Sequence, residues 1–188
     1  MLLYLCRDSK AQKATTMNYD NMSQAELIAI IEILSMDVSF GIMKKERGIL
    51  DYGDIADGTD VIFIDLGNVH AANHKYTQDG YDSFVRNVTS KLKNEDTLIK
   101  FGGDEIVIIP RAGTRIVQYI ARITTLLQEN NIYAVLAATK SLGGLCDTVK
   151  YLDAIVSAEK LELELTGAKP HRDQPYQLLE SFVIMTDY

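Results

Sequence analysis

The sequence predicts a ferredoxin-like, palm-type α/β fold, an α+β sandwich in which helices pack on a central mixed, largely antiparallel sheet. The order of apolar segments carries this prediction, because strand, helix, strand, strand, helix, strand and helix follow one another, with a possible closing strand. A Gly-Gly pair joins the two middle strands, which is typical of a tight β-hairpin. The 188 residues, 47% of them hydrophobic, suffice for one domain with a sizeable core and an appendage.

The first part of the chain predicts an arm, a helix and a buried strand. Residues 1–22 are expected to form a docking strand or a partly ordered N-terminal arm. Ser23 to Glu26 match a capping box, so we expect a helix over 24–36, and its largely apolar surface predicts burial on the domain or against a partner. The next expected segments are a turn leading into a short helix over 37–45, a loop over 51–60, a buried strand over 61–67 and helical residues 68–93 with a break at 77–80.

The second part predicts the hairpin and the elements that complete the sheet and its helices. The expected segments are a hairpin of 98–101 and 106–109, a helix capped by Thr114, a strand over 132–138, a helix over 146–164, a linker over 169–175 and a last strand over 178–185. We therefore divide the chain into the arm 1–22, a leading helix 23–36 that is a candidate dimer element, a main domain 37–164 and a C-terminal extension 165–188.

Composition argues against several kinds of partner. With 19 basic and 26 acidic residues the formal net charge is −7, so we expect no nucleic-acid polymer, which would require a basic face. Cys6 and Cys146 are the only cysteines and form no metal-type cluster, which is typical of a reduced, cytoplasmic protein. No apolar run approaches the length of a transmembrane helix, so no membrane partner is expected.

Three carboxylates are the candidate functional residues. Asp65 lies at the end of the buried strand, while Asp104 and Glu105 follow Gly102 and Gly103 in the hairpin turn. In the expected topology that strand and the hairpin are neighbours, so the three acids meet at one end of the sheet. Converging carboxylates repel one another unless a cation binds, and Mg²⁺ or Mn²⁺ takes oxygen ligands and completes its shell with substrate phosphates. Glycines let a phosphate approach the backbone, so the pattern indicates metal-assisted nucleotidyl transfer.

Plainer alternatives stay open for the same residues. The acidic hairpin can be an ordinary solvated turn, and Asp65 can cap the helix that follows its strand. His70 and His74 have a spacing that can bind Zn²⁺, but no HExxH motif surrounds them.

Residues 101–106, Phe-Gly-Gly-Asp-Glu-Ile, resemble the signature of the GGDEF family, with Ile106 in place of Phe. The segment Ile64–Leu66 resembles the first metal-binding strand of that family. The resemblance covers about residues 24–164, and it implies a diguanylate cyclase that condenses two GTP molecules into cyclic di-GMP on a palm-like fold.

The resemblance also implies individual roles. Asp65, Asp104 and the backbone carbonyl of Leu66 would bind Mg²⁺, and Asp104 and Glu105 would be catalytic. Lys160 would contact the phosphates.

Two residues match the positions that read guanine in the family, Asn73 and Asp82. Their side chains can satisfy the guanine edge that carries N1, N2 and N3. Each subunit would bind one GTP, so two subunits must face each other, and the resemblance implies a homodimer with the helix over 24–36 as its best mediator.

Several positions depart from the family pattern, and two further functions stay open because of them. The departures are Gly67 for the second metal-strand acid, His74, Thr77, Gln78 and Tyr81 in the base-reading motifs, Glu164 for a phosphate-binding Arg, and Lys93 to Asp96 for the product-inhibition motif. One alternative is a degenerate domain that only binds GTP or a cyclic dinucleotide. The other is a palm-type cyclase that makes a different cyclic nucleotide or oligonucleotide. A palm-like structural domain without a site is the plainest alternative.

Overall fold

The structure is a computed structural model that describes residues 22–167 and 181–186. The chain forms two units, Met1–Leu34 and Ser35–Tyr188. The expected N-terminal arm, apart from its last residue, and the expected linker over 169–175 lie outside the described residues.

The first unit contains helix α1 (Gln24–Leu34), which confirms the leading helix. Its N-terminus has the expected capping box, because Ser23 Oγ donates a hydrogen bond to the Glu26 carboxylate and accepts one from the Glu26 amide. No residue of α1 is buried, so burial against a partner stays a prediction.

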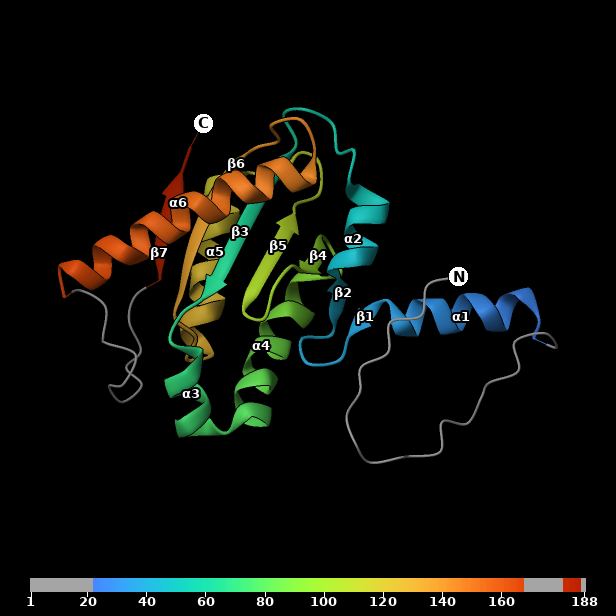
Figure 1. Ribbon diagram of the computed structural model, residues 1–188, viewed down its shortest axis with the longest axis horizontal. Helices are drawn as coiled ribbons and strands as arrows, with labels where there is room; N and C mark the ends of the chain where they lie inside the picture. Colours follow the sequence, from blue (N-terminus) through green and yellow to red (C-terminus); the bar gives the residue numbers. More distant parts are fainter. Residues whose placement is uncertain (1–21, 168–180, 187–188) are drawn as a thin grey trace, which may run out of the picture. The chain divides into compact units, whose positions relative to one another are not determined.

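The second unit folds around a seven-stranded sheet in the order β1-β2-β4-β5-β3-β6-β7 (Figure 1). Four strand pairs are antiparallel, while β2 with β4 and β6 with β7 are parallel, which confirms the mixed, largely antiparallel sheet. The strands are β1 (Met36–Asp37), β2 (Ile42–Lys44), β3 (Asp60–Leu66), β4 (Thr97–Lys100), β5 (Glu105–Ile109), β6 (Ala134–Lys140) and β7 (Phe182–Met185). The helices are α2 (Lys45–Tyr52), α3 (Val69–Tyr76), α4 (Gln78–Leu92), α5 (Ile116–Glu129) and α6 (Leu145–Leu165).

Two local predictions are wrong. Residues 37–45 are not only a turn before a helix, because β1 and β2 form a short hairpin there and β2 joins the sheet beside β4. Strands of two and three residues are too short for an alternating pattern to reveal them. Thr114 does not cap α5, since the N-cap residue is Arg115 and the Thr114 hydroxyl donates instead to the Arg111 carbonyl at 2.6 Å.

The break expected within residues 77–80 is confirmed and lies at Thr77, between α3 and α4. Thr77 has a positive φ of 66°, which interrupts the helix, and its hydroxyl caps α4 by accepting a hydrogen bond from the Gly80 amide in the first turn. No helix within the described ranges is both long and apolar enough to cross a bilayer.

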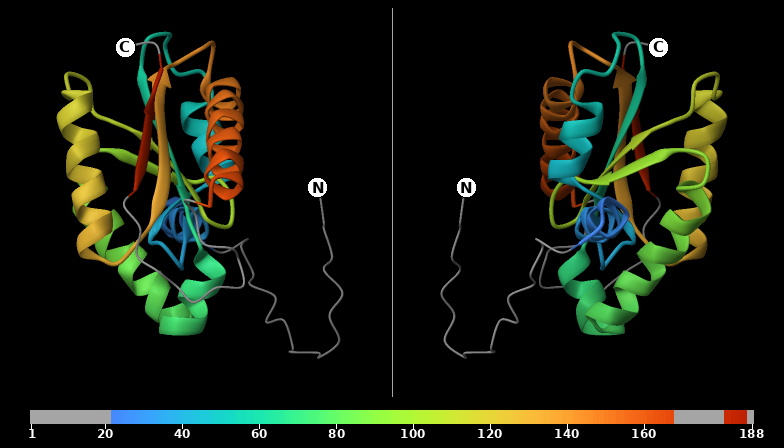
Figure 2. Two further views of the ribbon diagram at one scale, coloured as in Figure 1. Left: turned by 90° about the vertical axis from the view of Figure 1, so that its left-hand side faces the viewer. Right: turned by 90° about the vertical axis from the view of Figure 1, so that its right-hand side faces the viewer.

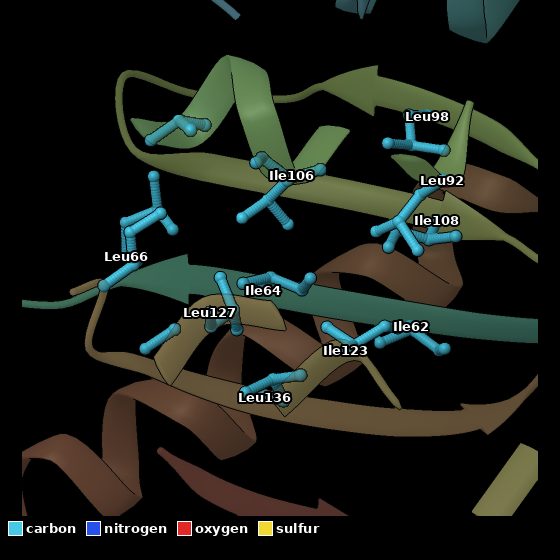
Figure 3. Packing of buried hydrophobic residues seen from close by; sticks show 14 of the residues in the cluster. Ile62, Ile64, Leu66, Leu92, Leu98, Ile106, Ile108, Ile123, Leu127 and Leu136 are labelled. Carbon is cyan, nitrogen blue, oxygen red and sulfur yellow. The ribbon is translucent and has the colours of Figure 1, made fainter. Parts of the chain in front are cut away.

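Alternation along the strands divides the core into two clusters, one on each face of the sheet. Helices α5 and α6 lie on opposite sides of the sheet (Figure 2). On one face, Ile62, Ile64 and Leu66 of β3 pack with residues of α4 and α5 (Figure 3). On the other face, Val61 and Phe63 pack with residues of α6. Asp65 is the next odd-numbered position, so the same alternation turns its side chain to the α6 face.

Candidate functional site

The expected carboxylate cluster lies where β3 ends and β5 begins. Asp65 is directly opposite Glu105 in the antiparallel register of these strands. The Leu66 amide donates a hydrogen bond to the Asp104 carbonyl at 2.9 Å, and the Phe101 amide donates to the Glu105 carbonyl at 2.9 Å. The structure therefore brings Asp65, Asp104 and Glu105 to one end of the sheet.

A lysine from α6 contacts this end of the sheet. The buried residues of α6 include Leu145, Val149, Leu152 and Val156, a stripe at helical spacing that Lys160 continues beyond the core. The Lys160 Nζ atom donates to both carboxylate oxygens of Asp65 at 2.8 Å. The Asp65 side chain is only 9% exposed and that of Lys160 is 25% exposed. Two residues that the sequence assigned separately, one to a metal and one to phosphates, are thus paired with each other.

The local charge at the cluster is negative despite Lys160. Burial raises the pKa of the Glu105 carboxyl above its usual range, and the negative charges of Asp153, Asp65 and Asp104 raise it further, while Lys45 lowers it. Sequence reasoning missed Asp153, although it lies seven residues before Lys160 and therefore near the same face of α6. A cation that enters here relieves repulsion among several carboxylates.

The packing around Gly67 explains why this position has no acidic side chain, which is one departure from the expected motif. A Cβ atom at this position would lie 2.2 Å from a ring carbon of Tyr133, so the packing leaves no room for an aspartate side chain. Burial raises the pKa of the Tyr133 hydroxyl, and the charges of Asp65 and Glu159 add to this effect. A buried aromatic ring therefore takes the space beside Asp65 in which a second acid was expected.

The residues are suited to bind Mg²⁺ together with the phosphates of a nucleotide, and they do not form a metal site from protein ligands alone. In the described part of the chain, no three His, Cys, Asp or Glu side chains are grouped closely enough to hold a metal ion. Mg²⁺ in nucleotide sites, however, needs one or two carboxylates and takes its other ligands from phosphates and water. Asp65 and Asp104 satisfy that requirement once Lys160 no longer holds Asp65. We call Asp65, Asp104, Glu105 and Lys160 the phosphate end of the candidate site.

The base end of the candidate site, defined as Asn73 and Asp82, lies on the two helices that follow β3. Asn73 is in the second turn of α3, which begins three residues after β3 ends, and Asp82 is near the start of α4. The Oδ1 atom of Asn73 is buried and has no hydrogen-bond partner among the described residues. Because buried polar atoms are normally paired, this unpaired oxygen makes Asn73 a candidate for contact with a ligand.

Asp82 lies in the field of a charged cluster that sequence reasoning only partly foresaw. Burial raises the pKa of the Asp82 carboxyl, while the charges of Lys100 and Arg86 lower it. The Lys100 Nζ atom donates to Ser39 Oγ at 2.7 Å and to Asp37 at 3.3 Å. The sequence signal for Lys100 was its place at the end of a strand, directly before Phe101-Gly102-Gly103, and it was overlooked.

Glu164, Asp96 and the pair His70 and His74 are the remaining candidate residues. Glu164 is exposed on α6, one turn beyond Lys160. Asp96, in the segment that resembles a product-inhibition motif, accepts hydrogen bonds from the Arg111 amide and the Tyr119 hydroxyl. The rings of His70 and His74 meet edge to face with centroids 4.6 Å apart.

Comparison with known proteins identifies the fold. No family model matches the sequence, and no curated protein sequence matches it. Solved structures do match the fold. The diguanylate cyclase/phosphodiesterase of Caldicellulosiruptor saccharolyticus is 18% identical, with a TM-score of 0.58 over 71% of this chain and 91% of that chain.

Two further structures agree. The GGDEF domain of DgcB from Caulobacter crescentus, solved in complex with c-di-GMP, is 15% identical, with a TM-score of 0.53 over 81% of this chain and 93% of that chain. The diguanylate cyclase SiaD of Pseudomonas aeruginosa, solved with its activator SiaC, is 14% identical, with a TM-score of 0.57 over 89% of this chain and 68% of that chain. At these identities the likeness establishes that the chain has the fold of GGDEF domains.

Proposed function

We propose that this chain is a diguanylate-cyclase-type nucleotidyltransferase that condenses two GTP into cyclic di-GMP as a homodimer. The observation that carries the proposal is the phosphate end, where Asp65, Asp104 and Glu105 meet at one end of the sheet and Lys160 of α6 pairs with Asp65. The fold supports it, because the matching structures include diguanylate cyclases and a GGDEF domain bound to c-di-GMP.

The base end supports guanine as the base. Asn73 Oδ1 can accept a hydrogen bond from the guanine N2 amino group, which gives this buried atom a partner. The Asp82 carboxylate can accept from N1. Adenine has no N1–H and no N2 amino group, so this pairing favours GTP over ATP.

The phosphate end supports the chemical step. The 3′-hydroxyl oxygen of one GTP attacks the α-phosphorus of the other, the bond to the bridging oxygen breaks, and pyrophosphate leaves. Glu105 or Asp104 accepts the hydroxyl proton, and the raised pKa of Glu105 suits a general base. Mg²⁺ or Mn²⁺, when bound by Asp65, Asp104 and the Leu66 carbonyl, would supply neutralisation of the phosphate charge and activation of the hydroxyl.

Each subunit supplies one half of the reaction, because ring closure requires a second attack in the opposite direction. The homodimer brings two GTP molecules face to face, and Gly102 and Gly103 let the phosphates approach the backbone. The exposed apolar residues of α1, which include Ile28, Ile31 and Leu34, suit it as the dimer element.

A second function is favoured by two observations at Asp65. Tyr133 fills the space beside Gly67 in which another acid was expected, and Lys160 already occupies the Asp65 carboxylate. These features suit a domain that binds GTP or a cyclic dinucleotide without turnover.

Product chromatography after incubation with GTP and Mg²⁺ or Mn²⁺ separates the two. Cyclic di-GMP with two pyrophosphates per product supports the cyclase, and Asp104→Ala should then reduce turnover at least a hundredfold, while Asp57→Ala, at an exposed acid before β3, should not. Unchanged GTP with measurable GTP affinity supports the binding domain. Turnover of ATP in place of GTP would show a palm-type cyclase with a different product.

A further inference from the structure

The ion pair between Lys160 and Asp65 has a consequence for the order in which ligands bind. The lysine ammonium contacts both oxygens of the carboxylate, at 2.8 Å each. A divalent cation bound to Asp65 needs at least one of these oxygens and would lie within a few ångströms of the ammonium. Like charges at that separation repel each other strongly in a partly buried site, so metal and Lys160 compete for Asp65.

Phosphates change this competition because they offer the ammonium another anionic partner. Lys160 is a quarter exposed, and its flexible stem lets the ammonium leave Asp65 without unfolding the end of α6. Once it leaves, the Asp65 carboxylate loses its paired cation. Its charge then adds to those of Asp104, Glu105 and Asp153, and this negative cluster favours a metal ion.

We propose that Lys160 makes metal binding conditional on nucleotide binding: its ammonium closes Asp65 in the nucleotide-free protein, and triphosphate draws it away and opens Asp65 to the metal. The inference rests on the proposed function only in placing phosphates within reach of Lys160. The coupling is reciprocal, so a bound metal also frees Lys160 and raises the affinity for phosphates.

The packing beside Asp65 makes the competition for this carboxylate important for metal binding. Since the Tyr133 ring leaves no room for an acid at position 67, β3 supplies Asp65 as its one acid at the phosphate end. The contact between Lys160 and Asp65 therefore decides whether β3 offers a carboxylate to the metal.

The test measures the affinity of the protein for Mn²⁺ in the absence of nucleotide. Binding is followed by the loss of the paramagnetic resonance signal of the free ion during titration. Lys160→Met removes the competitor, and we expect its affinity for Mn²⁺ to rise at least tenfold over the wild type. Lys140→Met is the matched control, because Lys140 pairs with Asp60 at the other end of β3. Its Mn²⁺ affinity should equal that of the wild type.

Lys160→Arg is a second variant that still tests the competition if Lys160→Met is too unstable to measure. An arginine fork holds a carboxylate through two parallel hydrogen bonds, so this variant should bind Mn²⁺ no more tightly than the wild type. A second titration adds inorganic triphosphate, corrected for the Mn²⁺ that triphosphate itself chelates. Triphosphate should raise the affinity of the wild-type site for Mn²⁺ and leave that of Lys160→Met nearly unchanged.

Equal Mn²⁺ affinities for the wild type and a folded Lys160→Met, or a higher affinity in Lys160→Arg, would overturn the inference. Its failure is distinguishable from failure of the proposed function. A raised Mn²⁺ affinity in Lys160→Met with no cyclic di-GMP formed keeps the coupling and rejects the cyclase, whereas cyclic di-GMP with unchanged Mn²⁺ affinity does the reverse.

Discussion

The phosphate end and the base end of the candidate site differ in how far they are satisfied without ligand. At the phosphate end, the Asp65 carboxylate and the Lys160 ammonium pair with each other. At the base end, Asn73 Oδ1 is buried without a hydrogen-bond partner in the described part of the chain. One end is thus closed by internal contacts, and the other retains unused hydrogen-bonding capacity.

This difference predicts which measurement, stability or ligand binding, is sensitive to substitutions at each end. A paired end stabilises the free protein, and a ligand must compete with it. A buried polar atom without a partner destabilises the free protein by about 1–3 kcal/mol, and a ligand that donates to it recovers part of that free energy. Substitutions that break the pair at the phosphate end should therefore lower the stability of the free protein, whereas substitutions at the base end should leave stability nearly unchanged and weaken ligand binding.

Asp65→Ala should have the largest effect. It leaves the Lys160 ammonium without its carboxylate partner. Breaking a fully buried pair costs about 3–5 kcal/mol, and we expect about 2–4 kcal/mol here because Lys160 is a quarter exposed. Urea denaturation should show this loss, and turnover of GTP should be abolished.

The double variant Asp65→Ala/Lys160→Met is the control for the pair. Without the ammonium, the loss of the carboxylate should be much less harmful, so the two substitutions should be non-additive by more than 1 kcal/mol, roughly the range measured for contacting residues. Additive losses would show that Asp65 stabilises the protein through contacts other than Lys160.

Gly67→Ala tests the packing that excludes a second acid from the phosphate end. The new Cβ would lie 2.2 Å from the buried Tyr133 ring, and we expect a loss of about 1–3 kcal/mol, as for other overpacked sites. Gly103→Ala is the matched control, because its Cβ would meet no atom within 4 Å, and it should be nearly neutral. Equal stability of the two variants would mean that the Tyr133 ring can move aside at little cost in free energy.

Asn73→Ala should do the opposite of Asp65→Ala. It removes the buried oxygen that lacks a partner, so the free protein should lose little stability or gain some. The affinity for GTP should fall about tenfold, which corresponds to roughly 1.4 kcal/mol for a lost hydrogen bond. Calorimetric titration with GTP, and with ATP as the comparison, measures the effect. An equal loss for ATP would separate Asn73 from guanine recognition.

The sequence predicted the order of the main elements because each strand and helix carries its own period of apolar residues. It also brought Asp65 to Glu105, since the hairpin must pair with the preceding strand in this topology. It did not predict β1 and β2, which are too short to show a period. Nor did it predict the pairing of Lys160 with Asp65 or the contact of Tyr133 with Gly67. Both join segments far apart in the chain, and no local pattern reports side-chain distance across a sheet.

Glu105→Gln should have the smallest effect on stability, and this effect depends on pH. The pKa of Glu105 is raised in the folded protein above its ordinary value of 4.5, chiefly by burial and then by neighbouring carboxylates. As the pH rises from 4.5 through the raised value, the unfolded chain releases this proton before the folded protein does, so ionisation favours unfolding and stability falls. Glu105→Gln removes that loss, and the variant should be more stable than the wild type at neutral pH but not below pH 4.5.

The gain should be modest, because the Glu105 side chain is partly exposed and water screens its neighbours. Urea denaturation of both proteins between pH 4 and pH 8 measures it, with Glu129→Gln on the exposed end of α5 as a control for net charge. A difference that does not change with pH would remove Glu105 from the cluster of interacting acids. A difference that disappears on adding Mn²⁺ with triphosphate would instead place the cation among those acids, since a bound cation offsets the repulsion that the substitution relieves.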